Sequence, residues 1–140
     1  MTKTLKQRTI RSFVLRAGRM TDAQEKAYQT LWHEYGLVCH HHRLNLQEAF
    51  GREAPLVLEI GFGMGDSLLN QAIHEPHRDF LGVEVHKPGV GRLMNEAKKA
   101  GVTNLRVICE DAVEVLADGL GPQSLEGVQI YFPDPWHKKR

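Results

Sequence analysis

The chain has two cysteines, no long apolar run and no acidic residue among its first 20 positions. Cys39 and Cys109 are too few for the disulfide framework of a small secreted protein, so a reducing, cytoplasmic setting is expected. No apolar stretch approaches the ~20 residues that a membrane-spanning helix needs. The basic N-terminus also lacks the apolar segment of a secretory signal. These absences predict a cytoplasmic protein that does not cross a membrane.

Positive charge gathers at both ends of the sequence, although the net charge is only +1 and the middle is therefore acidic. Basic arms on a near-neutral body favour an anionic partner. A solvated, disordered leader would carry the same charges, and charge alone does not separate the two alternatives. The basic residues at the two ends are Lys3, Lys6, Arg8, Arg11, Arg16, Arg19, Lys138, Lys139 and Arg140.

The segment from Thr21 to Gly36 predicts a helix. Thr21 and Gln24 have the spacing of a capping box. Gly36 is expected to end the helix in the left-handed conformation. Residues 37–54 show no clear periodicity and are expected to be irregular. Apolar residues recur every four positions along the helix, with two aromatic residues beside them: Ala23, Ala27, Leu31, Tyr35, Tyr28 and Trp32.

From Pro55 onward, strand patterns alternate with helix patterns. LVLEIG, FLGVEVH, NLRVICED and GVQIYF predict four strands, and SLLNQAI, VGRLMNEAKKAG and AVEVLAD predict the helices between them. Such alternation predicts βαβ units, that is, a parallel sheet with helices on both faces. We therefore expect a basic arm at 1–20, a helical region at 21–54 and a Rossmann-like α/β domain at 55–140.

The segment EIGFGMGD joins the first of these strands to the first helix. Glycines let a backbone turn tightly and approach a ligand closely. Gly61, Gly63 and Gly65 alternate, whereas the G-x-G-x-x-G pattern of dinucleotide sites would need glycine at Asp66. Glu59 and Asp66 flank the loop, and their charges would repel a diphosphate. A ligand that carries an ammonium group and hydroxyls is favoured instead.

Two further acids follow the next two strands. Glu84 lies 23 positions after Gly61, near the ~20-residue spacing at which an acid binds ribose hydroxyls. Asp111 follows the third strand, where a polar group can reach an adenine edge. Because the carboxyl ends of parallel strands share one edge of the sheet, the acids are expected to converge. The ligand that combines adenine, ribose and a cationic amino-acid tail is S-adenosylmethionine.

The chain ends in PDPWHKKR, directly after the fourth predicted strand. Prolines on both sides of Asp134 restrict the backbone around it, so its carboxylate is expected to be held in place. At this point the sequence resembles the bacterial tRNA (guanine-N7)-methyltransferases. LEIGFGMGDSLL, FLGVEVHKPGV, LRVICEDAVEVL and YFPDPWHKKR carry the resemblance, with RTIRSFVLRAGRMT and LWHEYGL upstream.

The resemblance implies a Rossmann-like S-adenosylmethionine-dependent methyltransferase that methylates N7 of a variable-loop guanine in tRNA. It implies cofactor contacts at Glu59, Glu84, Asp111 and Asp134, with Gly61 and Gly63 in the glycine loop. Asp134 would also be catalytic, and Lys138 would contact tRNA. Members of the family continue past PDPWHKKR, so we expect the C-terminal part of the sheet to be missing and the chain to be shortened. Monomer and weak dimer both stay open.

Guanine N7 carries a lone pair and no proton. Methylation there requires alignment of N7, the methyl carbon and sulfur, with negative potential near the developing charge. Asp134 is therefore expected to orient and stabilise rather than to act as an obligatory base. A base in a loop is the better target, because the major groove of A-form RNA is deep and narrow. The expected phosphate contacts are Arg8, Arg11, Arg16, Arg19, Lys138, Lys139 and Arg140.

Three functions are compatible with these features: the tRNA methyltransferase, a non-catalytic RNA- or nucleotide-binding module, and a small-molecule methyltransferase. The basic C-terminal residues argue against the third. Cys39, His40, His41 and His42 are contiguous, and contiguous ligands do not easily face one ion, so no metal site is predicted.

Overall fold

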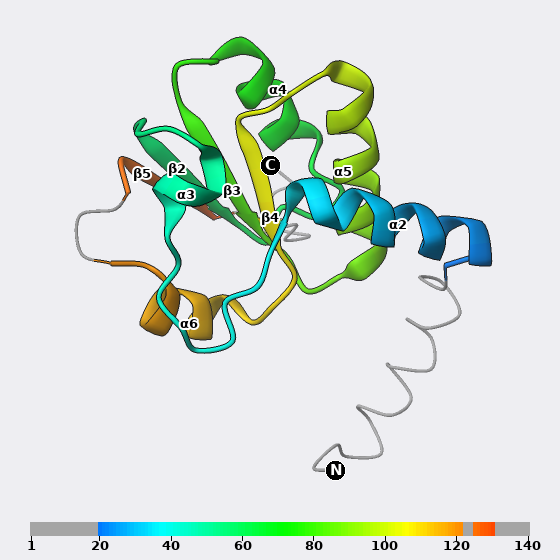
Figure 1. Ribbon diagram of the computed structural model, residues 1–140, viewed down its shortest axis with the longest axis horizontal. Helices are drawn as coiled ribbons and strands as arrows, with labels where there is room; N and C mark the ends of the chain where they lie inside the picture. Colours follow the sequence, from blue (N-terminus) through cyan, green and yellow to red (C-terminus); the bar gives the residue numbers. More distant parts are fainter. Residues whose placement is uncertain (1–19, 122–124, 131–140) are drawn as a thin grey trace, which may run out of the picture.

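The computed structural model describes residues 20–121 and 125–130 (Figure 1). The elements follow the alternation predicted from Pro55 onward, with a helix and a short strand before it. In chain order they are α2 (Asp22–Tyr35), β1 (Gly36–Leu37), α3 (Leu46–Phe50), β2 (Leu56–Ile60), α4 (Asp66–His74), β3 (Asp79–Val83), α5 (Lys87–Ala100), β4 (Leu105–Ile108), α6 (Ala112–Glu114), the π-helical turn η1 (Val115–Gly119) and β5 (Gly127–Ile130).

The described strands form one sheet in the order β1-β4-β3-β2-β5, and every pair of neighbours is parallel. The four predicted strands are confirmed as β2, β3, β4 and β5, and they lie side by side with the third at one end and the fourth at the other. Each connection between them has a helical crossover, as parallel neighbours require. The sheet therefore has the predicted Rossmann-like arrangement.

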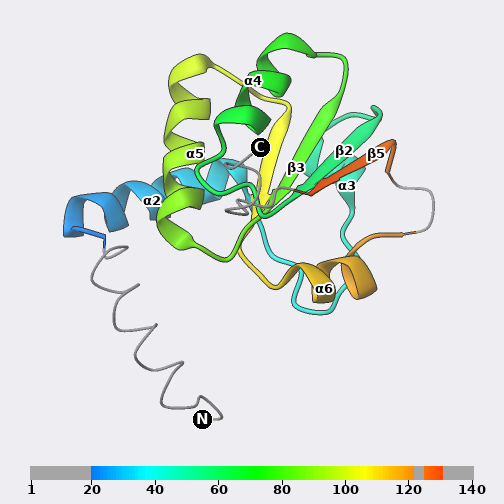
Figure 2. The same cartoon turned by 180° about the vertical axis from the view of Figure 1, so that it is seen from behind.

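Helices cover both faces of this sheet. Figures 1 and 2 show α2, α4 and α5 together on one side, and α3 and α6 on the other. The first side buries Phe80 and Met94 with the apolar face of α5, and the second buries Leu58 and Ile108. The four α5 residues predicted to face the core, Val90, Leu93, Met94 and Ala97, are all buried, which confirms the helical periodicity.

The N-terminal segment belongs to the same core. The capping box is confirmed: Thr21 Oγ1 accepts from the amide of Gln24 at 3.1 Å, and Gln24 Oε1 accepts from the amide of Thr21 at 2.8 Å. The hydroxyl of Tyr35 donates to the carbonyl oxygen of Val102 at 3.0 Å, and both residues are buried. Helix α2 thereby packs against α5, and β1 extends the sheet beside β4. Ala23 and Ala27 were predicted on the apolar face but are exposed.

Two further predictions about the N-terminal segment are wrong. Gly36 is extended, with φ −84° and ψ 144°, because the chain passes directly from α2 into strand β1. Glycine is needed there because a β-carbon would overlap the ring of Trp32. The stretch at 37–54 is not irregular throughout: it holds part of β1 and the short helix α3, which Asn45 caps and Gly51 ends in the left-handed conformation.

No helix among the described residues is long and apolar enough to cross a membrane.

At the amino-terminal edge of the sheet, just before β4, the side chain of Asn104 fixes the turn after α4. Its Nδ2 donates to the carbonyl oxygens of Ala72 at 3.0 Å, Glu75 at 3.2 Å and Arg78 at 2.9 Å. Asn104 is buried, and its amide is thus a donor that three carbonyl groups of this turn share.

We predict that Asn104→Asp destabilises the fold, because a carboxylate would face three carbonyl oxygens in a buried position. The free energy of unfolding should fall by roughly 2–4 kcal/mol, the cost of an unpaired buried charge. Urea denaturation measures the change. Asn70→Asp, on the exposed face of α4, is the control and should stay within about 1 kcal/mol of the parent chain. Equal losses for the two variants would contradict the role of Asn104.

Candidate functional site

The turn between β2 and α4 depends on three glycines. Gly61, Gly63 and Gly65 have φ of 69°, 65° and 86°, a region that side chains with a β-carbon rarely adopt. The amide of Gly61 donates to the carbonyl oxygen of Val83 at 2.8 Å, which ties the end of β2 to β3. The loop therefore bends sharply at the carboxyl edge of the sheet, where open α/β folds bind ligands.

Helix α5 closes against this loop through another glycine. A β-carbon at Gly89 would overlap the carbonyl oxygen of Gly63, so the two backbone segments touch without an intervening side chain. No sequence motif marks Gly89, because its role arises from contact between segments 26 positions apart. The absent side chain lets the start of α5 support the loop from beneath.

Glu84 holds the glycine loop from the next strand. Its Oε1 accepts from the amide of Gly63 at 2.7 Å, and its Oε2 accepts from the amides of Val85 and His86 at 3.0 Å each. Three backbone donors thus occupy most of the carboxylate, which offers about four acceptor sites. The predicted convergence of this acid on the glycine loop is therefore present, with an anchoring role that the sequence did not indicate.

Glu59 lies on β2 and is the buried acid of the site, with an exposed fraction of 4%. Its Oε1 accepts from Nε2 of Gln129 on β5 at 2.9 Å. Burial raises the pKa of the Glu59 carboxyl, and the hydrogen bond from Gln129 opposes that rise. The group therefore sits in a low-dielectric position where an incoming cation would interact with it strongly.

Asp111 begins the next segment at the edge of β4. Its Oδ1 accepts from the amide of Val113 at 2.8 Å and caps α6. Two apolar residues close in sequence to Glu84 and Asp111 are exposed to solvent: Val85 is 67% exposed and Val113 is 73% exposed. Exposed valines beside carboxylates at adjacent strand ends would suit a flat aromatic ring with polar groups at its rim.

Asp66 behaves differently from the other acids. It starts α4 and its Oδ1 accepts from Nη1 of Arg92 at 2.6 Å, with a side chain that is 75% exposed. The pairing offsets its charge, so its predicted repulsion of a diphosphate is weak.

The comparison with known families gives a direct result. Residues 53–140 match the Methyltransf_4 family model, described as "Putative methyltransferase". The match covers more than half of the chain and includes the glycine loop and the three acids. The chain belongs to this methyltransferase family.

Relatives in the methyltransferase family are similar over almost the whole chain. The tRNA (guanine-N(7)-)-methyltransferase of Saccharophagus degradans is 54% identical over 100% of this chain and 61% of its own length. The enzyme of the same name from Idiomarina loihiensis is 57% identical over 95% of this chain and 54% of its own. The chain thus spans about half to three fifths of these relatives. Among solved structures, the 16S rRNA methyltransferase KamB matches 87% of this chain and 49% of its own at 18% identity, with a TM-score of 0.47.

Several predicted site residues of this methyltransferase-family chain lie outside the described residues. Asp134 is one of them, so its distance from Glu59 and Glu84 is not part of the structure. The predicted RNA contacts Arg8, Arg11, Arg16, Arg19, Lys138, Lys139 and Arg140 lie outside it as well. Their roles stay predictions from the sequence.

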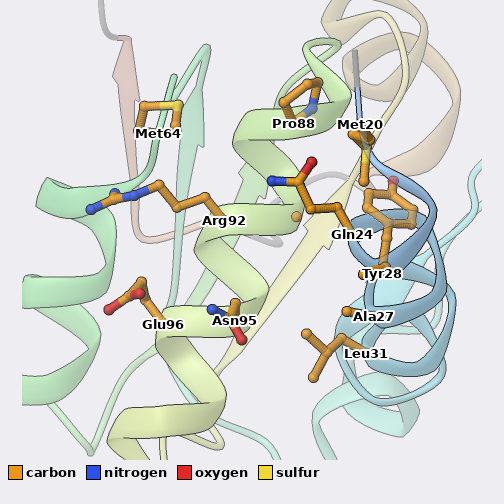
Figure 3. A pocket seen from close by; sticks show the side chains of 12 residues that line it. Met20, Gln24, Ala27, Tyr28, Leu31, Met64, Pro88, Arg92, Asn95 and Glu96 are labelled. Carbon is orange, nitrogen blue, oxygen red and sulfur yellow. The ribbon is translucent and has the colours of Figure 1, made fainter. Parts of the chain in front are cut away.

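A cavity of about 490 Å³ lies between α2 and α5, beside Met64 of the glycine loop (Figure 3). Ala27 and Leu31 of α2 face Asn95 of α5 across it. None of Glu59, Glu84 and Asp111 lines this space. The cavity therefore borders the glycine loop on a side away from these three acids.

The loop between β1 and α3 packs beside Asp111. Glu110 accepts from the amides of Cys39 at 2.6 Å and His40 at 2.9 Å. His41 Nδ1 lies 2.7 Å from Oδ2 of Asp118. His40 and His41 have φ of 45° and 65°, an uncommon conformation for residues other than glycine. The CHHH segment thus serves as a turn that carboxylates hold in place, a role that spacing alone did not predict.

We predict that Gly89→Ala disturbs the glycine loop. Its methyl group would meet the backbone of Gly63, which no side-chain rotation relieves, so the free energy of unfolding should fall by about 1–3 kcal/mol. The control is Gly91→Ala in the same helix, where the nearest atom to the new methyl is Tyr28 Cδ2 at 3.2 Å. That variant should stay within about 1 kcal/mol, because alanine favours the helix. Chemical denaturation of both variants makes the comparison, and similar stabilities would contradict the close contact.

We predict that His41 makes stability depend on pH. The Asp118 carboxylate raises the pKa of His41 above its usual value, with Glu114 contributing. A raised pKa stabilises the fold fully below the unfolded value of about 6.5, and the gain is lost as pH rises through the folded pKa. Urea midpoints measured from pH 5.5 to 8.5 should therefore fall less steeply with rising pH in His41→Asn than in the parent chain. Identical slopes would contradict the ion pair.

Proposed function

We propose that the chain carries out S-adenosylmethionine-dependent transfer of a methyl group to N7 of a guanine in tRNA. The observation that carries the proposal is the pairing of a buried carboxylate, Glu59, with a glycine turn that Glu84 anchors at the carboxyl edge of the sheet. The names of the relatives and the PDPWHKKR motif support the choice of tRNA. A tRNA substrate would place the activity in the cytoplasm.

The described residues fit S-adenosylmethionine in their chemistry. Glu59 supplies a buried negative charge for the ammonium group of the methionine tail. Glu84 keeps one acceptor position for ribose hydroxyls after its three backbone bonds. Asp111 would accept from the adenine amino group, between the exposed side chains of Val85 and Val113. Gly61 and Gly63 let the backbone approach the ligand.

The cofactor supplies an electrophilic methyl group, and the chain's task is to align it with the guanine. N7 needs no deprotonation, so no residue has to remove a proton before the bond to carbon forms. Asp134, restricted by its flanking prolines, would orient the guanine and stabilise the positive charge that develops on it. Lys138 and the other basic residues at the two ends would hold phosphates of the tRNA.

The direct test is methyl transfer from labelled S-adenosylmethionine to tRNA by the purified chain. Product should be 7-methylguanine in the variable loop, identified by nuclease mapping. Glu59→Gln should weaken S-adenosylmethionine binding by roughly tenfold or more, since it removes a charge-assisted contact. Glu53→Gln, an exposed acid before β2, is the matched control and should bind as the parent does. Binding of tRNA without product would support a non-catalytic RNA-binding module instead.

Two measurements on one variant separate alignment from cofactor binding at Asp134. Asp134→Ala should reduce turnover more than it weakens S-adenosylmethionine binding if the carboxylate orients the guanine. Comparable losses in both quantities would assign Asp134 to the cofactor alone. A chemistry-limited rate that rises steeply with pH through an essential base would contradict its proposed electrostatic role.

The tRNA complex should weaken strongly with salt. The logarithm of the association constant should fall by ~0.7–0.9 per phosphate neutralised for each tenfold rise in salt. Lys138→Ala should reduce that slope by about one contact, and a filter-binding titration at several salt concentrations measures it. A flat response would remove the basic residues from the proposal.

A further inference from the structure

Gln129 and Glu59 occupy opposed positions on neighbouring strands. They are register partners in the parallel pair β2 and β5, and Nε2 of Gln129 donates to Oε1 of Glu59 at 2.9 Å. On the other side of Glu59, the register partner is Gly82 of β3. A β-carbon at Gly82 would crowd the side chains of Phe62 and Leu68, so an apolar group fills that side. Among the register partners of Glu59, Gln129 is thus the polar one and Gly82 carries no side chain.

The contact matters because Glu59 is almost completely buried. A buried carboxylate without a hydrogen-bond donor is costly and tends to take up a proton. Burial raises the pKa of Glu59 and the amide of Gln129 lowers it, while no charged side chain among the described residues contributes. The ionised state of Glu59 therefore depends on a neutral partner.

The two oxygens of Glu59 have different roles. Oε1 is bonded to Gln129, whereas Oε2 makes no hydrogen bond to another residue within 20–121 or 125–130. A carboxylate oxygen accepts up to two hydrogen bonds, so Oε2 keeps both of its acceptor positions for a donor from outside these residues, whereas Oε1 keeps one. The bond to Oε1 fixes the carboxylate plane and hence the direction of Oε2.

We propose that Gln129 is a positioning residue of the methyl-donor site, which holds Glu59 so that Oε2 accepts from the ammonium group of the donor's amino-acid tail. This inference rests on the proposed function, since it assumes a nucleoside ligand with such a tail. An amide suits the task because it donates without carrying charge. Arginine or lysine at the same position would neutralise Glu59 and compete with the ligand's ammonium group.

The experiment compares two thioether nucleosides that differ in the amino-acid tail. S-adenosylhomocysteine carries the ammonium group, and 5′-methylthioadenosine lacks it. In Gln129→Met, which keeps the length of the side chain without its donor, calorimetric titration at pH 7.5 should show S-adenosylhomocysteine bound about tenfold more weakly. The affinity for 5′-methylthioadenosine should stay within about twofold of that of the parent chain.

The pH dependence gives a second readout that a purely structural role would not move. Without the Gln129 donor, the pKa of Glu59 rises further, so its carboxylate takes up a proton at a higher pH. The loss of S-adenosylhomocysteine affinity in Gln129→Met should therefore grow as pH falls from 8 to 6. Val128→Thr is the matched control on the same strand, since Val128 is 50% exposed, and it should leave both affinities unchanged.

Two results would overturn the inference: unchanged S-adenosylhomocysteine affinity in Gln129→Met, or an equal loss for both nucleosides. Failure of the parent chain to bind either nucleoside would instead overturn the proposed function, so the two failures are distinguishable. If Gln129→Met does not fold, Gln129→Asn makes the same comparison, because it keeps the amide but shortens its reach by one methylene group.

Discussion

The site depends on the hydrogen bond between the amide of Gly63 and the carboxylate of Glu84. It joins the turn after β2 to the end of β3, and the contact of Gly89 with the carbonyl of Gly63 supports the same peptide from α5. The same bond affects ligand choice. Dinucleotide folds place phosphate oxygens against backbone amides of the glycine loop, and here the Gly63 amide already serves a carboxylate. A diphosphate would therefore lose a donor and meet a negative charge in one place.

The two acids nearest the turn divide two tasks between them. Glu84 is bonded by three backbone amides and shapes the loop. Glu59 is buried and has one bonded oxygen, so its charge is available to a ligand. Three backbone bonds leave Glu84 about one acceptor position, so it offers less of its carboxylate to a ligand than Glu59 does.

The sequence was sufficient for the features that depend on local pattern. The four strands of the predicted domain follow from short apolar runs that alternate with helix patterns. The capping box at Thr21 and the buried face of α5 follow from spacings of three or four residues. Strand β1 could not be found this way, because two residues are too few for periodicity and pairing with Val107 and Ile108 creates it. Gly36 likewise takes its conformation from that pairing and from the ring of Trp32.

The same distinction holds within the site. The acids at strand ends could be predicted, because their positions along the chain place them at one edge of a parallel sheet. Gln129 and Gly89 could not, because their significance lies in a register and in a close backbone contact between distant segments. Spacing identifies which groups share an edge of the sheet. It does not identify which of them bond to one another and which remain for a ligand.

The turn between β1 and α3 extends this reasoning to the N-terminal segment. Glu110 accepts hydrogen bonds from two successive amides of the turn. The next residue, Asp111, caps α6 and is itself one of the predicted cofactor contacts. His40 and His41 adopt conformations that cost free energy, and tertiary bonds must offset that cost. The N-terminal segment is thus coupled to the adenine side of the proposed site through two consecutive carboxylates. This coupling gives a physical reason for α2 and β1 to precede the first βαβ unit of this chain.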